Sequence, residues 1–549
     1  MRPFISGTIA ALAVLATISA PAHAEDTQAR PKADPVDIAT TRVPAVSDTV
    51  AQAAERADDD AADLVAQLPA RRTDDFGLVG VTWARGFDDR GMTVQVRLRT
   101  DGAWAGWEEL DVESDEGEGG RDGTEPLWAG SADGVAVRVT SPTGQRPSGL
   151  TVSTIDPGST PAQAVTASNA FYDAAGDDAV TTVADGSPTY TPKPAIISRS
   201  AWGAKKNTYC DAPRTGSETR GVVVHHTAGT NTYTKAQSAG IVRAVQAYHM
   251  SGRDWCDIGY NFLVDKYGQI FEGRNGGVDK PVRGAHAGNK SVNTYTMGVS
   301  MMGTFTSTQP TDATKDAMVK LIGWRLGTTF HAAKGKYTLG GVVLDRIAGH
   351  RDVVSTACPG QAAYEWLSAS GGLRDRVEDY IANYTSPIKT KVIAMGRATT
   401  GPVYVGEYPF TTSPTGRKAR LGRLDMYSTT TYGTFSVGGS FRDGYNASGA
   451  QAGRLGVPIA NHQSTPVSSV TLQRFARGTV YRVQRGSVGV PYFLYGKIED
   501  RYVAIGEATS SLGAPRSSMS RLSNGAYRAY FAHGSIVQHT NGVVSVYPT

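Results

Sequence analysis

The sequence has 549 residues, of which 40% are hydrophobic and 19% charged, and its formal net charge is +4. At roughly 150 residues per domain, this length predicts about three or four domains. The composition excludes a collagen-like chain, a wholly disordered chain and a bundle of membrane helices. Basic residues are not concentrated on any one element, so nothing indicates a nucleic-acid partner.

The N-terminus resembles a secretory signal peptide, residues 1–24. Arg2 precedes an apolar, small-residue run from Phe4 to Ser19, and Pro21-Ala-His-Ala24 offers an A-x-A cleavage site. The alternative is an uncleaved anchor, although a run so rich in Ala, Ser and Thr is poorly suited to a hydrocarbon core of ~30 Å. No later segment is apolar enough to span a membrane, so we expect a secreted mature protein without a membrane partner.

Shifts in composition divide the mature chain. Residues 25–75 are rich in Ala, Asp, Thr and Arg and predict a linker or pro-segment, with a short helix as an option around residues 51–68. Apolar and polar residues then alternate over residues 76–157, between Gly/Asp clusters, which predicts a small antiparallel β domain. Residues 158–193, rich in Ala, Thr, Ser and Pro, predict a second linker. We found no chemistry in the β domain.

Strand and helix patterns mix over residues 194–385, which predicts an α/β domain. A Tyr-, Gly-, Ser- and Val-rich region, predicted to be all-β, occupies residues 386–549. An internal repeat lies in that region, because two short motifs recur at offsets of 57 and 56 residues. The alternative is chance recurrence of Gly-rich turns. The motif pairs are Leu455-Gly-Val-Pro458 with Leu512-Gly-Ala-Pro515, and Phe475-Ala-Arg-Gly478 with Phe531-Ala-His-Gly534.

The cysteine count is odd: Cys210, Cys256 and Cys358. In an oxidising compartment two cysteines pair and one is left over, and a thiol survives there best when something binds it. This is the first indication of a metal site. Six of the ten histidines also lie within residues 194–385.

A buried strand leads into His225 and His226. Neighbouring strand residues face opposite sides of a sheet, so only one of the two points at a given site. Further along, His350 and Cys358 lie eight residues apart in one loop. Two imidazoles and one thiolate suit a tetrahedral Zn²⁺ whose fourth position holds water. The alternative for Cys358 is a buried apolar residue before a proline turn.

Seven motifs occur in an order that resembles the peptidoglycan recognition proteins and the related zinc-dependent N-acetylmuramoyl-L-alanine amidases (amidase type 2). The resemblance covers roughly 190 residues and implies a mixed β-sheet with flanking helices. The motifs are Ile197-Ser-Arg-Ser-Ala-Trp-Gly203, Val224-His-His-Thr227, Trp255-Cys-Asp-Ile-Gly-Tyr-Asn-Phe262, Phe271-Glu-Gly-Arg274, Gly284-Ala-His286, Met297-Gly-Val-Ser-Met-Met-Gly303 and Gly349-His-Arg-Asp352 with Ala357-Cys-Pro-Gly360.

The resemblance implies hydrolysis of the amide between the muramic-acid lactyl group and L-alanine of peptidoglycan. It makes His225, His350 and Cys358 the Zn²⁺ ligands, and it gives catalytic positions to Tyr260 and Thr356. A threonine there supplies a hydrogen bond but no cation. The implied substrate-binding residues are His249, Trp255, Arg274, His286 and Asn289; a core position on a helix face is the alternative for His249.

Three points remain open in the sequence. Asn275-Gly-Gly-Val278 matches neither signature that sorts diaminopimelate from lysine stem peptides. The C-terminal repeats resemble LGFP-type repeats of secreted wall proteins, which implies that they attach the chain to the cell wall. With Cys358 on zinc, Cys210 and Cys256 are expected to form a disulfide, the alternatives being two buried thiols or one of them on the metal.

Rival functions are a non-catalytic peptidoglycan-binding protein on the same fold, and an adhesive protein with a vestigial amidase domain. The complete ligand set disfavours both. A muramidase or a triad hydrolase fits less well, because this domain shows no glycosidase-like carboxylate pair and no Gly-x-Ser-x-Gly run.

Overall fold

The computed structural model describes residues 35–46, 63–113, 120–158, 171–172, 191–206, 212–412 and 414–549. The predicted signal peptide lies outside these ranges. Within them, no helix combines the length and the apolar character needed to cross a membrane.

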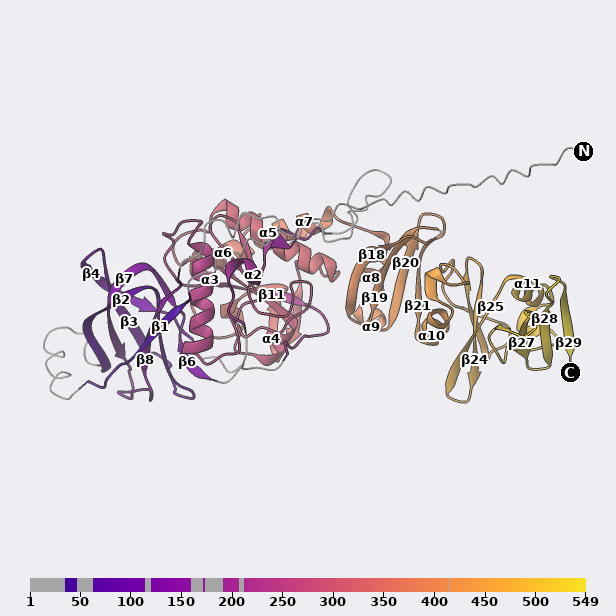
Figure 1. The fold of residues 1–549 in the computed structure, drawn as a ribbon, viewed down its shortest axis with the longest axis horizontal. Coiled ribbons are helices and arrows are strands. Elements are labelled where there is room, and N and C mark those ends of the chain that lie inside the picture. The colour runs from indigo at the N-terminus through magenta and orange to yellow at the C-terminus, as the bar shows by residue number, and fades with distance from the viewer. Residues whose placement is uncertain are drawn as a thin grey trace, which may run out of the picture. The chain divides into compact units, whose positions relative to one another are not determined.

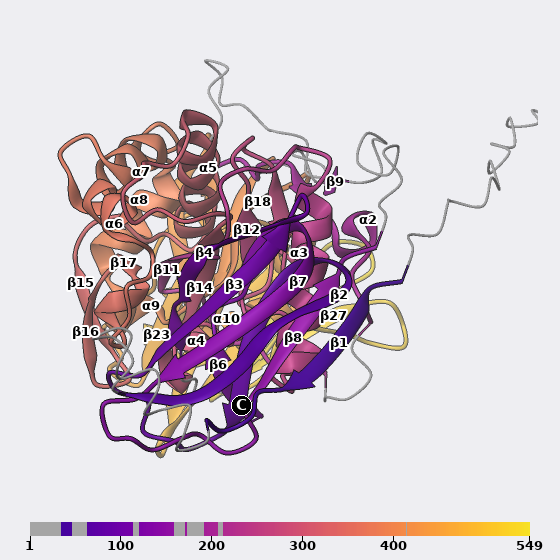
Figure 2. The same cartoon turned by 90° about the vertical axis from the view of Figure 1, so that its left-hand side faces the viewer.

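The N-terminal domain is an antiparallel sheet, in agreement with the prediction. Its strand order is β1-β8-β2-β7-β3-β4, and the short hairpin β5–β6 branches from it through pairing of β6 with β2 (Figure 2). Val79, Val81 and Val94 fill its core, as expected where alternate side chains of each strand face inward. The strands are β1 (Asp37–Arg42), β2 (Leu64–Ala84), β3 (Thr93–Thr100), β4 (Ala103–Leu110), β5 (Val112–Glu113), β6 (Arg121–Thr124), β7 (Leu127–Thr140) and β8 (Thr151–Asp156).

Part of the segment assigned as a linker belongs to this sheet. Strand β1 and the first residues of β2 lie within residues 25–75, and Val43, Ala66 and Leu68 are buried in the domain core. The expected helix around residues 51–68 is replaced, from Leu64 onward, by strand. Each of these strands contributes few inward apolar residues, and the segment between them is long, so the alternating pattern was too short to recognise.

The second domain is built on a seven-stranded mixed sheet of order β17-β11-β14-β12-β13-β10-β9, as the family resemblance implied. Figure 1 labels β11 of this sheet among the helices of the domain. Strands β17, β11, β14 and β12 run parallel to one another. The strands are β9 (Phe171–Tyr172), β10 (Ile196–Ile197), β11 (Gly221–His226), β12 (Phe262–Val264), β13 (Ile270–Glu272), β14 (Thr296–Met301) and β17 (Ile347–Gly349), with a separate hairpin of β15 (Lys336–Leu339) and β16 (Val342–Asp345).

Helices pack on this sheet through two apolar clusters. One cluster joins the sheet to helices α5, α6 and α7. The other contains α3 and also includes Leu78, Trp128 and Ile155 of the N-terminal domain. The two domains therefore share buried apolar side chains. The helices are α2 (Arg199–Trp202), α3 (Ser238–Ala247) with a π-helical turn at Tyr248–Gly252, α4 (Lys290–Tyr295), α5 (Asp312–Thr328), α6 (Gln361–Ser368) and α7 (Leu373–Ala382).

The C-terminal region contains three four-stranded antiparallel sheets. It differs from the all-β expectation because short helices accompany the sheets. The longest of them has 9 residues, which is too short for a helical apolar pattern to stand out in the sequence. The strands are β18 (Val403–Phe410), β19 (Gly416–Leu421), β20 (Leu424–Thr429), β21 (Gly433–Gly438), β22 (Gln463–Ser464), β23 (Val470–Phe475), β24 (Gly478–Arg485), β25 (Val488–Tyr495), β26 (Ser520–Arg521), β27 (Tyr527–Phe531), β28 (Gly534–Gln538) and β29 (Val544–Pro548). The helices are α8 (Pro387–Met395), α9 (Arg397–Thr400), α10 (Gly439–Ala447) and α11 (Gly496–Ala504).

The two repeat units make equivalent contacts. The Tyr445 hydroxyl donates to Gly456 O at 2.7 Å, and the Tyr502 hydroxyl donates to Gly513 O at 2.8 Å. In each unit the motif proline bridges to the motif phenylalanine. The offset of 57 residues between the tyrosines equals the offset of the Leu-Gly-x-Pro motifs, which argues against chance recurrence.

Candidate metal centre

The centre forms where two parallel strands end side by side. Strands β11 and β17 are neighbours, and Val224 lies in register with Gly349. The next residue of each strand is a histidine, so His225 and His350 come together, with ring centroids 4.4 Å apart. The turn His350–Asp352 that follows β17 starts the loop that returns to Cys358.

Cys358 completes a buried cluster of three possible ligands. The ligand atoms of His225, His350 and Cys358 all lie within 4.8 Å of one another. Cys358 Sγ is 3.7 Å from His225 Nδ1, close to the about 3.5 Å expected for S and N ligands of one tetrahedral zinc ion. This donor set therefore fits Zn²⁺.

His286 lies directly behind His225. His225 Nε2 is 3.1 Å from His286 Nδ1, and the two rings meet edge to face. With His225 donating from Nε2, its Nδ1 is left with a lone pair directed at the cluster, the arrangement that orients most metal-binding histidines. In the structure His286 contacts His225 directly, and the substrate-binding role that the resemblance implies for His286 stays a prediction.

Burial keeps these imidazoles neutral. It lowers the pKa of His225 well below its ordinary value, and it lowers the pKa of His286 to about 3. Burial also raises the pKa of the Cys358 thiol well above its ordinary value, and only a backbone hydrogen bond from His226 N, at 3.4 Å, favours its thiolate. Because ligands bind as neutral imidazole and thiolate, metal binding here would release a proton from Cys358.

The second histidine of the pair points elsewhere. His226 Nδ1 accepts a hydrogen bond from Phe305 N at 3.4 Å, and His226 Nε2 lies 3.3 Å from Asp111 of the N-terminal domain. The alternation of strand side chains thus assigns His225, and not His226, to the cluster.

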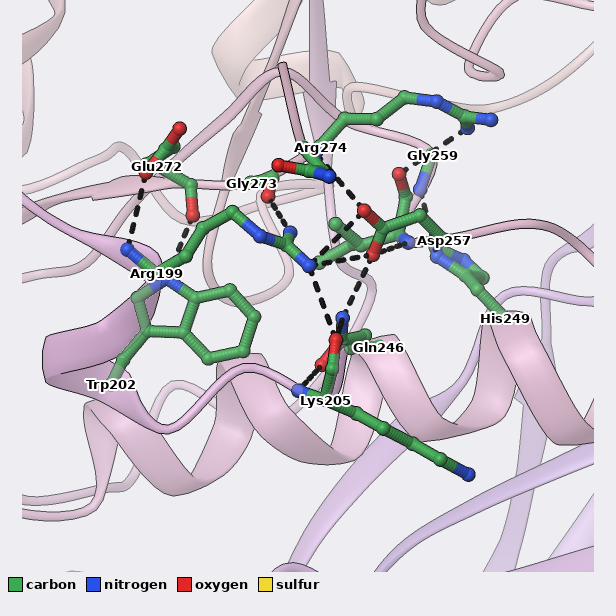
Figure 3. Close-up of polar contacts among 12 residues, drawn as sticks. Arg199, Trp202, Lys205, Gln246, His249, Asp257, Gly259, Glu272, Gly273 and Arg274 are labelled. Atoms are coloured by element: carbon green, nitrogen blue, oxygen red, sulfur yellow. Dashed lines mark hydrogen bonds and ion pairs between the residues drawn. The ribbon is translucent and has the colours of Figure 1, made fainter. Parts of the chain in front are cut away.

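Tyr260 lies against His225, with ring centroids 5.3 Å apart. Its segment is held by Asp257, which pairs with Arg199 Nη2 at 3.1 Å and accepts from Gln246 Nε2 at 2.8 Å and from Ile258 N (Figure 3). Burial raises the pKa of the Tyr260 hydroxyl well above its ordinary value, so it remains a hydrogen-bond donor.

Three of the predicted substrate-binding residues gather around this segment. The His249 ring packs on Trp255, with centroids 4.6 Å apart. His249 Nδ1 accepts a hydrogen bond from Gly259 N at 3.2 Å (Figure 3). Burial lowers the pKa of His249 to about 3. Arg274 N donates to Tyr260 O at 2.9 Å, and the Arg274 guanidinium lies 3.4 Å from Ile258 O.

Two other predicted site residues make structural contacts. The Asn289 side chain caps the N-terminus of α4 by accepting from Ser291 N and Val292 N, a contact that stabilises a helix start. Thr356 Oγ1 accepts from Cys358 N at 3.2 Å, so this hydroxyl shapes the loop that carries the thiol. No described contact joins Thr356 or Asn289 to the side chains of the cluster.

The N-terminal domain brings three acidic residues to the centre that the sequence pattern does not predict. Asp111 meets His226, Glu113 Oε1 lies 3.5 Å from His350 Nε2, and Glu125 accepts from the Tyr260 hydroxyl at 2.9 and 3.0 Å. Glu113 and Glu125 are hydrogen-bonded to each other, and burial with the Glu113 charge raises the pKa of Glu125. The negative charge of Glu113 therefore favours the protonated form of Glu125.

Among the described residues, Cys358 is a free, buried thiol. Cys210 lies outside the described residues, so the Cys210–Cys256 bridge stays a prediction.

Comparison with known proteins places this centre in a family. Residues 215–361 match the N-acetylmuramoyl-L-alanine amidase family, and residues 28–167 match the Rv3811 N-terminal galactose-binding domain-like family. Peptidoglycan-recognition protein SC2 of Drosophila simulans is 35% identical over 165 residues, which cover 30% of this chain and 80% of that protein. Peptidoglycan recognition protein 3 of Homo sapiens is 34% identical over 175 residues, 32% of this chain and 46% of that protein. The solved structure of Drosophila PGRP-LB aligns with 27% identity over 32% of this chain and 92% of that chain, with a TM-score of 0.26.

The chain therefore carries an amidase-type domain, and it belongs to the peptidoglycan recognition protein family. The matched segment contains His225, His350 and Cys358. The similarity to the curated relatives covers about a third of this chain, and the chain spans less than half the length of the human relative.

Proposed function

We propose that this protein is a secreted, zinc-dependent N-acetylmuramoyl-L-alanine amidase that acts on peptidoglycan. The observation that carries the proposal is the buried set of His225, His350 and Cys358 at the ends of two parallel strands, with Tyr260 beside it. Relatives that are named for peptidoglycan recognition support the substrate class.

The reaction adds water across the lactyl–alanine amide, which yields a lactyl carboxylate and a free alanine amino group. Zn²⁺ held by the three ligands would polarise the carbonyl group and lower the pKa of water toward ~7. His286 holds His225 in the tautomer that binds metal, and the Tyr260 hydroxyl, kept protonated by burial, donates a hydrogen bond to developing negative charge. His249 and Trp255 form a wall beside Tyr260 that suits substrate contact.

The competing function is peptidoglycan binding without catalysis. Digestion of purified cell wall with the zinc-loaded mature protein separates the two, with product masses as the measurement. An amidase releases intact glycan strands with free lactyl groups and stem peptides with free L-alanine amino termini. Wall that is bound but yields neither product, with the wild type and also with the Glu113→Ala/Glu125→Ala double variant, would contradict the catalytic proposal.

Removal of the metal should abolish hydrolysis. A strong chelator is expected to reduce amide cleavage to background, and stoichiometric Zn²⁺ should restore it, because the chain supplies no other electrophile at this position. The zinc content of the purified protein, determined by mass spectrometry, should be one ion per chain. Undiminished turnover by metal-free protein would overturn the mechanism.

We further propose that the chain acts outside the cell, attached to the wall through its C-terminal repeats. Residues 1–24 and the Leu-Gly-x-Pro repeats support this location. A variant that ends at residue 385 should lose retention on purified wall. Equal retention of the full-length protein and the truncated variant would show that the repeats do not attach the protein to the wall.

The predicted Cys210–Cys256 bridge would close a loop of about 46 residues, which the chain-entropy estimate values at roughly 4 kcal/mol. Reduction should therefore lower the melting temperature, and it should leave Cys358 on the metal. Peptide mapping of unreduced, alkylated protein tests the pairing directly. Alkylated Cys210 and Cys256 in the native protein would rule the bridge out.

A further inference from the structure

The hairpin β5–β6 places carboxyl groups on three parts of the centre. We call residues 111–113 and 120–125 together the acidic hairpin. Its Asp111, Glu113 and Glu125 contact His226, His350 and Tyr260, respectively. His350 is a proposed metal ligand, and Tyr260 is proposed to contact the substrate. Both side chains are therefore already engaged by carboxyl groups of the acidic hairpin.

The three side chains of the cluster and Tyr260 are almost completely shielded from solvent. The exposed fractions of His225 and His350 are 0%, that of Cys358 is 1% and that of Tyr260 is 2%. Hydrolysis requires the substrate carbonyl within about 3–3.5 Å of the reacting groups. A glycan-linked stem peptide has no access to these side chains while the acidic hairpin is in place.

A specific set of contacts anchors the acidic hairpin to the amidase domain. Arg253 Nη2 donates to Glu113 O at 2.9 Å, and Arg121 N donates to Arg253 O at 2.9 Å. The Tyr248 hydroxyl donates to Thr124 O at 2.8 Å. These bonds are made to backbone atoms, so they fix the path of the hairpin and not merely the positions of its side chains.

We propose that the acidic hairpin is a built-in occupant of the amidase centre, so that this structure is a latent form that must release the hairpin before wall can bind. The inference rests on the proposed function. Hydrolysis leaves a carboxylate on the lactyl group, and Glu113 presents the same chemical group beside His350. Glu125 takes the hydrogen bond that Tyr260 would otherwise donate to substrate. The hairpin thus competes with substrate for the side chains that bind it.

The opposite reading makes the same carboxylates part of the catalytic machinery. The two readings predict opposite results for the Glu113→Ala/Glu125→Ala double variant. A latent enzyme should bind N-acetylmuramyl-L-alanyl-D-isoglutamine, a small fragment that contains the scissile bond, at least about tenfold more tightly and cleave wall faster, because the competing group is gone. Catalytic carboxylates should instead leave the double variant with less turnover. Glu109→Gln, an exposed glutamate on β4, is the matched control.

A pair of glycines tests release of the hairpin without touching its carboxylates. A Cβ on Gly120 would lie 2.2 Å from Arg253 O, whereas a Cβ on Gly86, which has the same φ of +88°, would meet nothing within 4 Å. Gly120→Ala and Gly86→Ala therefore carry the same backbone strain, but only Gly120→Ala pushes the hairpin away from Arg253. Tyr248→Phe, which removes a hydrogen bond to Thr124 O, provides a second route to release.

The readout is the alkylation rate of Cys358 in metal-free, full-length protein, followed by peptide mass spectrometry. We expect alkylation to be slow in the wild type and in Gly86→Ala, and at least about tenfold faster in Gly120→Ala, which corresponds to 1.4 kcal/mol in the opening equilibrium. Rapid alkylation of wild-type Cys358, or equal rates in the two glycine variants and in Tyr248→Phe, would overturn the proposal. If the variants show faster alkylation and tighter fragment binding but cleave no substrate, the latent-form proposal is supported and only the proposed amidase function is contradicted.

Discussion

Cys358→Ser should strip the protein of zinc and abolish amide hydrolysis. A neutral hydroxyl replaces the one anionic ligand of the set, and the two imidazoles that remain bind Zn²⁺ weakly. We expect the loss in affinity to exceed the roughly 10–100-fold that outer-shell substitutions cause. Competition against a chromogenic chelator measures it.

Cys358→Asp is the control for this variant, because a carboxylate is also a zinc ligand. It should recover part of the zinc affinity that Cys358→Ser loses. Circular dichroism should show both variants folded. Full zinc occupancy and full activity in Cys358→Ser would mean that another group binds the metal.

Tyr260→Phe should retain zinc and fold but turn over more slowly by about 10²–10³-fold, the range for loss of one donor to developing oxyanion charge. The ring still packs against His225 and His249, so the effect isolates the hydroxyl group. Because the acidic hairpin also contacts this hydroxyl, the comparison is best made in the Glu113→Ala/Glu125→Ala chain, by single-turnover kinetics.

Tyr233→Phe is the matched control, since the Tyr233 hydroxyl is also buried and donates to Met302 O at 3.2 Å away from the cluster. It should change stability without changing the rate of the chemical step. If Tyr260→Phe is as fast as Tyr233→Phe, the Tyr260 hydroxyl has no part in the reaction.

The grouping of His225, His350 and Cys358 could be predicted because these residues follow local rules. His225 ends a recognisable buried strand, and His350 and Cys358 share one short loop. Strand alternation limited the choice between His225 and His226, and the family resemblance selected His225. The structure brings the three side chains together.

Other parts of the centre depend on contacts that no local pattern encodes. Asp111 and Glu113 flank a valine, and such alternation of charged and apolar residues is typical of a solvent-exposed face, so nothing in the sequence marked them as partners of the histidines. The acidic residues also lie more than a hundred positions from their partners in the sequence. Asp111 is 115 positions from His226, and Glu125 is 135 positions from Tyr260. The role of His286 depends on which ring nitrogen of His225 faces the cluster. Tertiary contacts set that ring orientation, so the sequence pattern does not reveal it.

The apolar cluster common to the two domains affects how the protein is best handled in isolation. Leu78, Trp128 and Ile155 cover α3 residues such as Val242 and Val245. A chain that began at residue 191 would expose that helix face to water as a contiguous apolar patch, and such patches promote self-association. The amidase domain is therefore expected to be soluble and well behaved only when it is expressed together with the β domain.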